Sequence, residues 1–264
     1  MKYDNLLTLV ILLFVIFLSG CRSSEDLIYL KDVSQEEWMK GLPEAETEYL
    51  VKAGDILYVS IKSMNPEVNT LFNPEEGAMA GASTSYQKFT TPQGAYLYGF
   101  EVDMNGNLNL PVLGSIAVKG HLQEDVEKIV QERADLYLKD ATVKVKLLNY
   151  KVTVLGEVRS PGVYYNYNND FTVLEALAMA NGNTDYASIK RVMVMRPESG
   201  GKRTYLLDLS SKDIFQSPAF YLHPNDYVFV EPDKNKNFQL NSSAISVTFS
   251  SLSMLVAVIG LIIR

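Results

Sequence analysis

The stretch from Tyr96 to Tyr164 constrains the fold more than any other part of the chain, because it combines a hairpin signal, a helical repeat and an alternating strand. Asn105-Gly106 lies between two alternating apolar runs, and both residues tolerate the positive φ angles of tight hairpin turns. Apolar residues then recur at helical spacing from Leu122 to Tyr137, with acidic residues in the first turn, where the helix dipole favours them. Residues 142–147 alternate between apolar and polar, as in a half-buried strand. This order predicts an α+β fold.

The same stretch resembles the polysaccharide export family, the Wza-like outer-membrane lipoproteins. The family's export domain carries a run V-D-x-x-G-x-I-x-L-P-x-x-G-x-I-x-V-x-G, then a helix and a V-x-V strand. This chain matches the run with Val102-Asp103, Gly106, Leu110-Pro111, Gly114-Ser115-Ile116, Val118 and Gly120. Upstream, Tyr49-Leu50-Val51-Lys52-Ala53-Gly54-Asp55 matches the family's opening Y-x-V-x-x-G-D. His121 stands where the family usually places Ser or Thr as the helix N-cap.

The residues after Asn149 resemble the SLBB module, a β-grasp domain. Gly156-Glu157-Val158-Arg159-Ser160-Pro161-Gly162 matches its G-E-V-x-x-P-G entry, and Asn225-Asp226 replaces its closing Gly-Asp. Thr172 and Glu175 have capping-box spacing, and the helix that they begin should end at Asn181-Gly182, which accept the left-handed conformation. Further strands are expected near residues 190–196, 203–209 and 227–230. We therefore predict an export domain of mixed β-strands with one helix at 49–149, followed by a β-grasp domain at 150–233.

The N-terminus has the features of a lipoprotein signal peptide. Leu6–Leu18 is a 13-residue apolar run broken only by Thr8, which is the length of a signal-peptide core and too short to span a bilayer. Leu18-Ser19-Gly20-Cys21 is the pattern that lipoprotein signal peptidase reads. We expect residues 1–20 to be removed and acyl chains on Cys21 to hold the protein to a membrane lipid layer. A plain signal peptide with an incidental cysteine is the alternative.

Two further segments carry weaker predictions. Residues 21–48 read as an N-terminal lead-in, in which Leu27–Leu30 could form an edge strand. Residues 65–93 read as a long loop punctuated by prolines and glycines, and no chemistry is assigned to them.

Residues 238–264 are predicted to form a C-terminal membrane helix. No charged residue lies between Lys236 and Arg264, and a helix over Ser242–Ile263 would be about 33 Å long, enough for a hydrocarbon core of about 30 Å. Small residues recur three and four apart and share one helix face, namely Ser243, Ser246, Ser250, Ser253, Ala257 and Gly260. Because small residues permit close helix approach, this stripe is predicted to face neighbouring helices or a wet lumen. A monomeric tail anchor with incidental serines is the alternative.

Composition and missing motifs narrow the function. The net charge of −7 argues against a nucleic-acid partner, and a lone cysteine excludes an intramolecular disulfide or a Cys-based zinc site. The sequence holds no P-loop, dinucleotide fingerprint, H-E-x-x-H or G-x-S-x-G motif. His121 and His223 are isolated, so we expect no catalytic, metal or cofactor site.

The resemblance implies a lipid-anchored outer-membrane protein with its bulk in the periplasm, whose copies assemble a channel for capsular polysaccharide or exopolysaccharide. It further implies a ring of about eight copies, since head-to-tail contacts close only when the rotation fits. An inner-membrane partner, a polysaccharide copolymerase or tyrosine autokinase, belongs to the same expectation. Two alternatives stay open: a periplasmic saccharide-binding lipoprotein without a pore, and a periplasmic carbohydrate-active enzyme.

Overall fold

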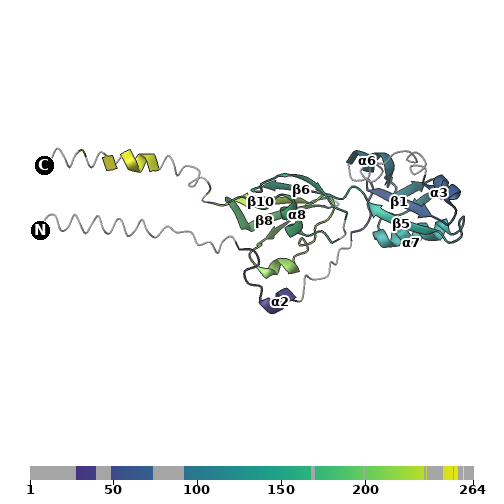
Figure 1. The fold of residues 1–264 in the computed structure, drawn as a ribbon, viewed down its shortest axis with the longest axis horizontal. Helices are drawn as coiled ribbons and strands as arrows, with labels where there is room; N and C mark the ends of the chain where they lie inside the picture. The colour runs from purple at the N-terminus through teal and green to yellow at the C-terminus, as the bar shows by residue number, and fades with distance from the viewer. Residues whose placement is uncertain are drawn as a thin grey trace.

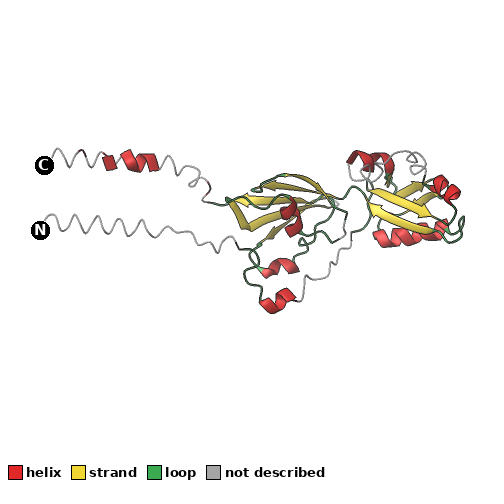
Figure 2. Ribbon diagram, viewed as in Figure 1, coloured by secondary structure: helices red, strands yellow, loops and turns green. Residues whose placement is uncertain are grey.

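The structure, a computed structural model, describes residues 28–39, 49–73, 92–167, 170–198, 200–234, 236, 246–251, 253–254 and 258. Within these residues the chain forms two units that lie side by side along the long axis of the molecule (Figure 1). Both units combine strands with helices (Figure 2), which confirms the prediction of an α+β fold. Each unit has its own cluster of buried apolar side chains, and Leu147 packs against both clusters.

The first unit is built around strand β1, which pairs antiparallel with β2 on one side and with β5 on the other. Strands β3 and β4 form a separate antiparallel hairpin. The described elements of this unit are β1 (Ile56–Lys62), α3 (Pro66–Phe72), α6 (Pro92–Tyr98), β2 (Phe100–Glu101), β3 (Asn107–Leu110), β4 (Gly114–Ala117), α7 (Gln123–Ala134) and β5 (Thr142–Leu147). Helix α7 buries Val126, Val130 and Ala134 in the core and so covers β5.

Side chains of α7 close the free edge of β5. The backbone N–H of Val143 donates to Gln131 Oε1 at 2.9 Å, and that of Val145 donates to Glu127 Oε2 at 3.0 Å. Gln131 Nε2 donates to the carbonyl of Ala141 at 2.9 Å. An edge strand with free N–H groups invites another strand to pair, so these contacts protect this side of the sheet.

The second unit contains a five-stranded sheet in the order β7-β6-β10-β8-β9, in which only the β6–β10 pair is parallel. Its elements are β6 (Lys151–Gly156), β7 (Gly162–Tyr165), α8 (Val173–Met179), β8 (Ala187–Glu198), β9 (Gly201–Leu207), the 3₁₀ helix η3 (Lys212–Gln216) and β10 (Tyr227–Pro232). Helix α8 has the predicted capping box between Thr172 and Glu175. Asn181 (φ 59°) and Gly182 (φ 75°) follow its end in the left-handed conformation, as predicted.

The lead-in packs on the second unit, although it precedes the first unit in the chain. Leu30 is buried in the second core, and its N–H donates to the carbonyl of Leu209 at 3.0 Å. Helix α2 (Gln35–Met39) continues this segment, and Glu37 pairs with Lys212 of η3 at 2.8 Å. The predicted edge strand at 27–30 is wrong over its described residues: they form no strand, and Leu30 has φ 50°, which an extended strand does not allow.

Four other predictions need correction. The predicted loop 65–93 contains helix α3, because Asn65 caps the helix N-terminus and Pro66 supplies its first residue. The prediction of one helix in the first unit is therefore wrong, since its described residues form α3, α6 and α7. The N-cap of α7 is Leu122 rather than His121, and its side chain makes no capping bond. The Asn105-Gly106 turn forms, but only Gly106 has positive φ (88°); its N–H donates to the carbonyl of Asp103, as in a type I turn followed by a left-handed glycine.

Candidate functional site at the junction of the two units

The junction is formed by two turns of the same design, one from each unit. In residues 52–55 the N–H of Asp55 donates to the carbonyl of Lys52 at 3.2 Å, and Gly54 has φ 85°. In residues 223–226 the N–H of Asp226 donates to the carbonyl of His223 at 3.1 Å, and Asn225 has φ 68°. Positive φ at the third position is the mark of a type II turn, where Gly and Asn are favoured. This explains why Asn225 can replace the family's glycine.

Each turn ends in a buried aspartate that binds back to the residue opening the turn. Asp55 Oδ2 accepts the N–H of Lys52 at 2.8 Å, and Asp226 Oδ2 accepts the N–H of His223 at 2.8 Å. Burial raises the pKa of both carboxyl groups, and the hydrogen bonds that they accept oppose this shift. Asp55 also accepts the Tyr49 hydroxyl at 2.9 Å. The two carboxylates differ chiefly in this further partner: a phenol for Asp55, a guanidinium for Asp226.

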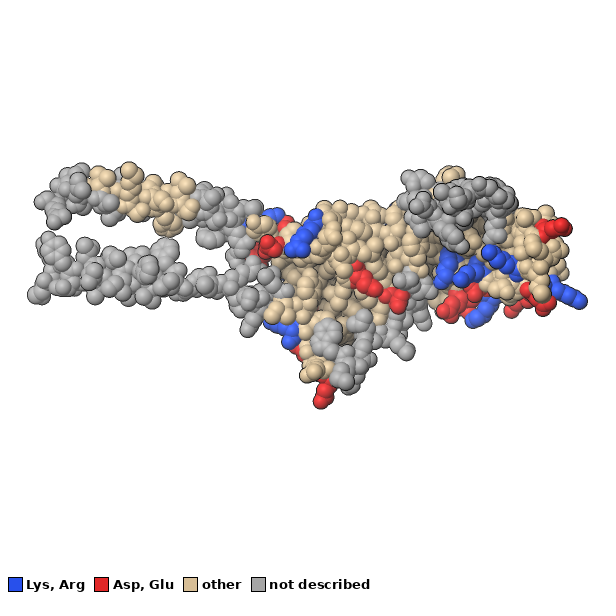
Figure 3. Space-filling model, viewed as in Figure 1, with Lys and Arg blue, Asp and Glu red and all other residues tan. Residues whose placement is uncertain are grey.

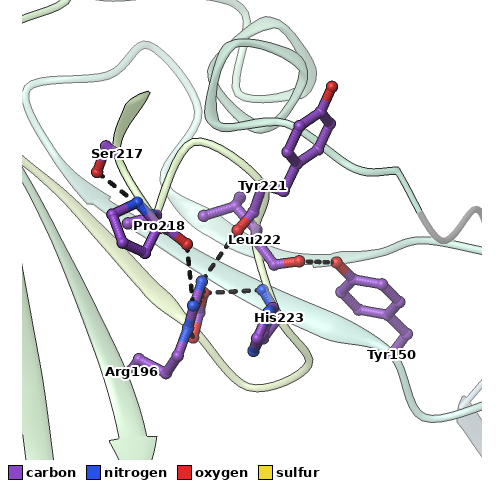
Figure 4. A network of polar contacts seen from close by, with 9 residues as sticks. Tyr150, Arg196, Ser217, Pro218, Tyr221, Leu222 and His223 are labelled. Atoms are coloured by element: carbon purple, nitrogen blue, oxygen red, sulfur yellow. Dashed lines mark hydrogen bonds and ion pairs between the residues drawn. The ribbon is translucent and has the colours of Figure 1, made fainter. Parts of the chain in front are cut away.

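The partner of Asp226 is Arg196 from β8, and both side chains are buried (Figure 4). Arg196 Nη2 lies 2.9 Å from Asp226 Oδ2, and its Nε donates to both carboxylate oxygens at 3.2 Å. The same guanidinium donates to the carbonyls of Pro218 and Tyr221 at 3.1 and 2.9 Å. Because a buried charge costs several kcal/mol unless it is fully paired, this network fixes residues 218–226 against β8.

Aromatic and amide side chains join the two turns. The rings of Tyr49 and His223 meet edge to face, with centroids 6.0 Å apart. Asn149 Oδ1 accepts the N–H of Ile56 at 3.0 Å, and its Nδ2 donates to the carbonyl of Gly54 at 3.1 Å. Asn149 therefore ties the start of β1 to the chain that enters the second unit.

His223 is neutral at pH 7. Burial, together with the nearby positive charges of Arg196 and Lys52, lowers its pKa to about 4. Next to it, the Tyr150 hydroxyl donates to the carbonyl of Leu222, and burial raises the pKa of Tyr150 (Figure 4). At pH 7 the imidazole of His223 is therefore uncharged and the phenol of Tyr150 keeps its proton.

A cavity of about 140 Å³ and a groove of about 360 Å³ share Tyr49 and Pro224 as common walls. The cavity lies between the start of α7 and the second unit and is lined by Tyr49, Leu122, Gln123, Glu124, Leu147, Tyr150, Leu222, His223 and Pro224. The groove runs past both turns and includes Lys52, Asp55, Glu198 and Asn225. The groove, unlike the smaller cavity, reaches the roughly 300–1,000 Å³ that is typical of small-ligand sites. Among the residues that the structure describes, no cluster of three His, Cys, Asp or Glu residues could hold a metal ion.

The lipid-attachment residue and the tail residues that the sequence singles out are not among the residues that form this junction. Cys21, Ser243, Ala257 and Gly260 fall outside the described residues. Ser246, Ser250 and Ser253 are exposed in short helical pieces, where Ser250 Oγ donates to the carbonyl of Ser246 at 2.8 Å and Ser253 Oγ to that of Ser250 at 2.9 Å. No helix within the described part of the chain is both long and apolar enough to cross a membrane. The lipid attachment and the packing face of the tail stay predictions.

The junction has no local signal in the sequence. His223 is isolated along the chain, and Arg196 and Asp226 lie 30 residues apart. The Gly54-Asp55 and Asn225-Asp226 motifs were visible, but nothing local indicated that two turns 171 residues apart in the chain share one junction.

Comparison with known proteins gives these two units their family. Residues 43–148 match the family described as polysaccharide biosynthesis/export protein, and residues 150–230 match the SLBB domain. The chain belongs to the polysaccharide export family. We therefore call the first unit the export domain and the second the SLBB domain. The matched family consists of transport proteins rather than enzymes.

Two curated relatives carry the same name, EPS I polysaccharide export outer membrane protein EpsA. The protein from Ralstonia solanacearum is 30% identical over 192 residues, which cover 70% of this chain and 48% of the relative. The protein from Ralstonia nicotianae is 30% identical over 161 residues, covering 60% and 40%. The chain thus spans about half the length of the first curated relative and less than half the length of the second.

Proposed function

We propose that this protein is a subunit of an outer-membrane polysaccharide exporter. The observation that carries the proposal is the export domain followed directly by an SLBB domain, each with its own core, in a chain similar to proteins named for polysaccharide export. In this proposal the bulk of the chain lies in the periplasm, Cys21 is acylated, and residues 238–264 enter the outer membrane as a helix. The exported material is capsular polysaccharide or exopolysaccharide, and no enzymatic step is assigned to this chain.

The position of the lead-in supports this placement. Cys21 and Ile28 are seven residues apart, so even a fully extended chain spans no more than about 24 Å between them. Residues 28–37 pack on the SLBB domain, and β10 at the other end of the fold belongs to the same domain. An acylated Cys21 would therefore hold the SLBB domain near the membrane, with the export domain farther into the periplasm.

Assembly of several copies completes the proposal. We expect a ring of about eight subunits, because head-to-tail contacts close into rings when the rotation fits. The small-residue face of the tail would pack between neighbouring helices or line the pore, and an inner-membrane copolymerase or tyrosine autokinase would deliver the polymer. The hydroxyls of Ser250 and Ser253 already donate to carbonyls within the helix, so for these two residues it is small size rather than hydrogen bonding that would matter at such a contact.

Export assays with three versions of the chain test the proposal. A strain that lacks the protein should regain surface polysaccharide with the wild-type chain, and should lose it with Cys21→Ala or with a chain ending at residue 237. Mass spectrometry of the mature N-terminus checks the acyl chains on Cys21. Within the tail, Ser250→Leu should disturb assembly more than Val256→Leu, because bulk on the small face separates the helices. Normal export by the truncated chain would contradict the channel.

A saccharide-binding lipoprotein without a pore is the second candidate. The cavity and groove at the junction favour it, since ligand sites often lie between domains. This candidate predicts saturable binding of polymer fragments by the purified protein and no conductance in a planar bilayer. Pore currents from the wild-type chain that vanish on removal of residues 238–264 would support the channel instead.

A further inference from the structure

The SLBB sheet has one buried face and one outer face. Val154, Val192 and Val228 belong to the buried face, which packs against α8 and the second core. Residues between them along each strand point the other way, because side chains alternate across a sheet. We define the outer face as the outward-pointing side chains of the five strands, and the strand register places two rows of them side by side at its centre. The first row is Leu155, Phe229, Met193 and Leu206, and the second is Val163, Thr153, Tyr227, Met195 and Thr204.

The outer face is apolar and open. Leu155, Val163 and Leu206 are 40%, 50% and 57% exposed, which is unusual for three large apolar side chains on one sheet. All four residues of the first row are hydrophobic, so they form an apolar band across four strands. In Figure 3 the upper middle of the SLBB half shows no charged side chains, whereas charged groups lie at its far end and lower side and gather on the lower side of the export half. An apolar band of this kind marks a surface that another molecule covers.

The size of the outer face indicates a weak individual contact. Five strands about 4.8 Å apart and about five residues of 3.3 Å each give roughly 400 Å². Covering it would bury roughly 800 Å² in total, below the roughly 1,200 Å² at which stable pairs begin. Such a contact holds when it is repeated around a closed assembly, in which each subunit makes it twice.

A second exposed surface lies on the opposite side of the same domain. In Figure 1 the sheet is on the upper side of the SLBB domain, and α8 and then α2 lie below it. Ile28 and Tyr29 of the lead-in are 50% and 38% exposed, and Met179 at the end of α8 is 43% exposed. The Tyr29 hydroxyl accepts a hydrogen bond from Asn183 at 2.6 Å, which holds the lead-in close to the end of α8. We call these three residues, together with Glu36 of α2, the lead-in surface.

The two surfaces have complementary charge. On the outer face the charges of Arg191 and Glu231 cancel, because the two side chains form an ion pair. The exposed side chains of Lys151 and Lys202 then give this face a net positive charge. Lys202 Nζ lies 5.4 Å from the centre of the Tyr227 ring. The lead-in residues Lys31, Asp32, Glu36 and Glu37 carry a net charge of 1 − 3 = −2, and Lys212, which binds Asp32 and Glu37, reduces it to −1, so this side is weakly acidic. The two surfaces point in opposite directions within one molecule and can meet only between molecules.

We infer that the outer face of the SLBB sheet docks on the lead-in surface of a second copy of this chain. The inference rests on the proposed function, which requires a closed oligomer, and it names the surfaces that form it. The contact is head to tail, so each subunit uses both surfaces and the copies close into a ring. The lead-in, placed next to the acylated end of the chain, thereby becomes part of the subunit interface.

Paired cysteines test the contact directly. The full-length acylated protein in detergent receives Thr204→Cys on the outer face and Met179→Cys on the lead-in surface, and a short bismaleimide joins nearby thiols. The double variant should give a ladder of covalent oligomers up to the full ring, whereas each single variant should give none. A matched control replaces Met179→Cys by Met104→Cys, an 86% exposed position in the export domain, and should give no ladder. Dimers from Thr204→Cys alone would show two outer faces in contact and overturn the inference.

A charge variant provides the second measurement. Leu206→Glu places a carboxylate in the apolar band, and Leu136→Glu makes the same change at a 74% exposed position beyond α7. Native mass spectrometry across a dilution series should show dissociation of the Leu206→Glu oligomer at a protein concentration at least tenfold higher than for the wild type. The Leu136→Glu oligomer should dissociate at the same protein concentration as the wild-type oligomer. Circular dichroism should confirm that both variants are folded.

The outcomes separate the inference from the proposed function. If the wild-type chain is monomeric at every concentration, both the channel and the interface fail. If it is oligomeric but the double cysteine variant gives no ladder and Leu206→Glu behaves like Leu136→Glu, the interface is wrong and the channel stands. A ladder together with selective dissociation of Leu206→Glu supports the interface.

Discussion

Asp55 and Asp226 occupy the same position in two matching turns, one in each domain, and each precedes the strand at the centre of its domain's backbone pairing. Asp55 is followed by β1, which pairs with both β2 and β5, and Asp226 by β10, which pairs with both β6 and β8. Both carboxylates accept the N–H of the residue three positions earlier. The two domains thus meet through equivalent turns, and each turn fixes where a central strand begins.

The buried pair of Arg196 and Asp226 should be costly to break. Asp226→Asn leaves the Arg196 guanidinium without a charged partner in a buried place, and we expect a loss of about 3–5 kcal/mol in the free energy of unfolding. The solvent-screened pair of Arg191 and Glu231 is the control: Glu231→Gln should lower the free energy of unfolding far less than Asp226→Asn does. Urea unfolding at pH 7 measures both. Equal losses would show that burial does not set the importance of the Arg196 pair.

His223 should make stability depend on pH. The unfolded histidine takes up a proton below about pH 6.5, while burial keeps the folded one neutral down to about pH 4. The unfolded state therefore binds more protons in this window, and stability falls as the pH drops from 6.5 to 4. His223→Gln should reduce this fall, whereas His121→Gln, at an exposed residue, should leave it as in the wild type. Melting temperatures of the three proteins at pH 7, 5.5 and 4.5 make the comparison; parallel curves would rule out His223 as a source of the dependence.

Gly156 should not tolerate a side chain. It has φ 90°, and an added Cβ would lie 2.1 Å from the carbonyl oxygen of Val230 on β10. We expect Gly156→Ala to cost more than about 3 kcal/mol, since both backbone strain and a clash with a paired strand must be relieved. Gly200 separates the two causes, because it also has positive φ (100°) but no atom within 4 Å of the added Cβ. Gly200→Ala should cost only about 1–2 kcal/mol, the strain alone. Chemical denaturation gives both values.

The two cores should respond separately to mutation. Leu108 is fully buried in the export domain and Leu209 is fully buried in the SLBB domain. Each change to Ala should destabilise its own domain by about 2–5 kcal/mol. Calorimetry should show two unfolding transitions, with Leu108→Ala lowering one and Leu209→Ala the other. If both variants lower a single shared transition, the division of the chain near residues 149–151 is wrong.

Elements whose signals are local could be predicted from the sequence. The capping box of Thr172 and Glu175 and the left-handed residues after α8 depend on neighbours within a few positions, and both are confirmed. The alternation in β5 is confirmed as well, with Val143 and Val145 buried and Lys144 and Lys146 exposed. Helix α3 is an exception, because its Asn65-Pro66 start is equally compatible with the turns of a loop.

The order of the two domains and most of their strands follow from the sequence, because periodicity and turn residues act over short distances along the chain. The family follows from the resemblance of ordered motifs, such as those at residues 49–55 and 156–162, to those of the export and SLBB domains. Which distant residues meet depends on the tertiary fold. Leu30 enters a core built from residues after 149, Arg196 finds Asp226, and Tyr49 meets His223 across the junction. None of these contacts has a local signal, since each one depends on how whole strands and turns are brought together. The packing of the lead-in on the later domain is therefore a property of the fold rather than of any motif.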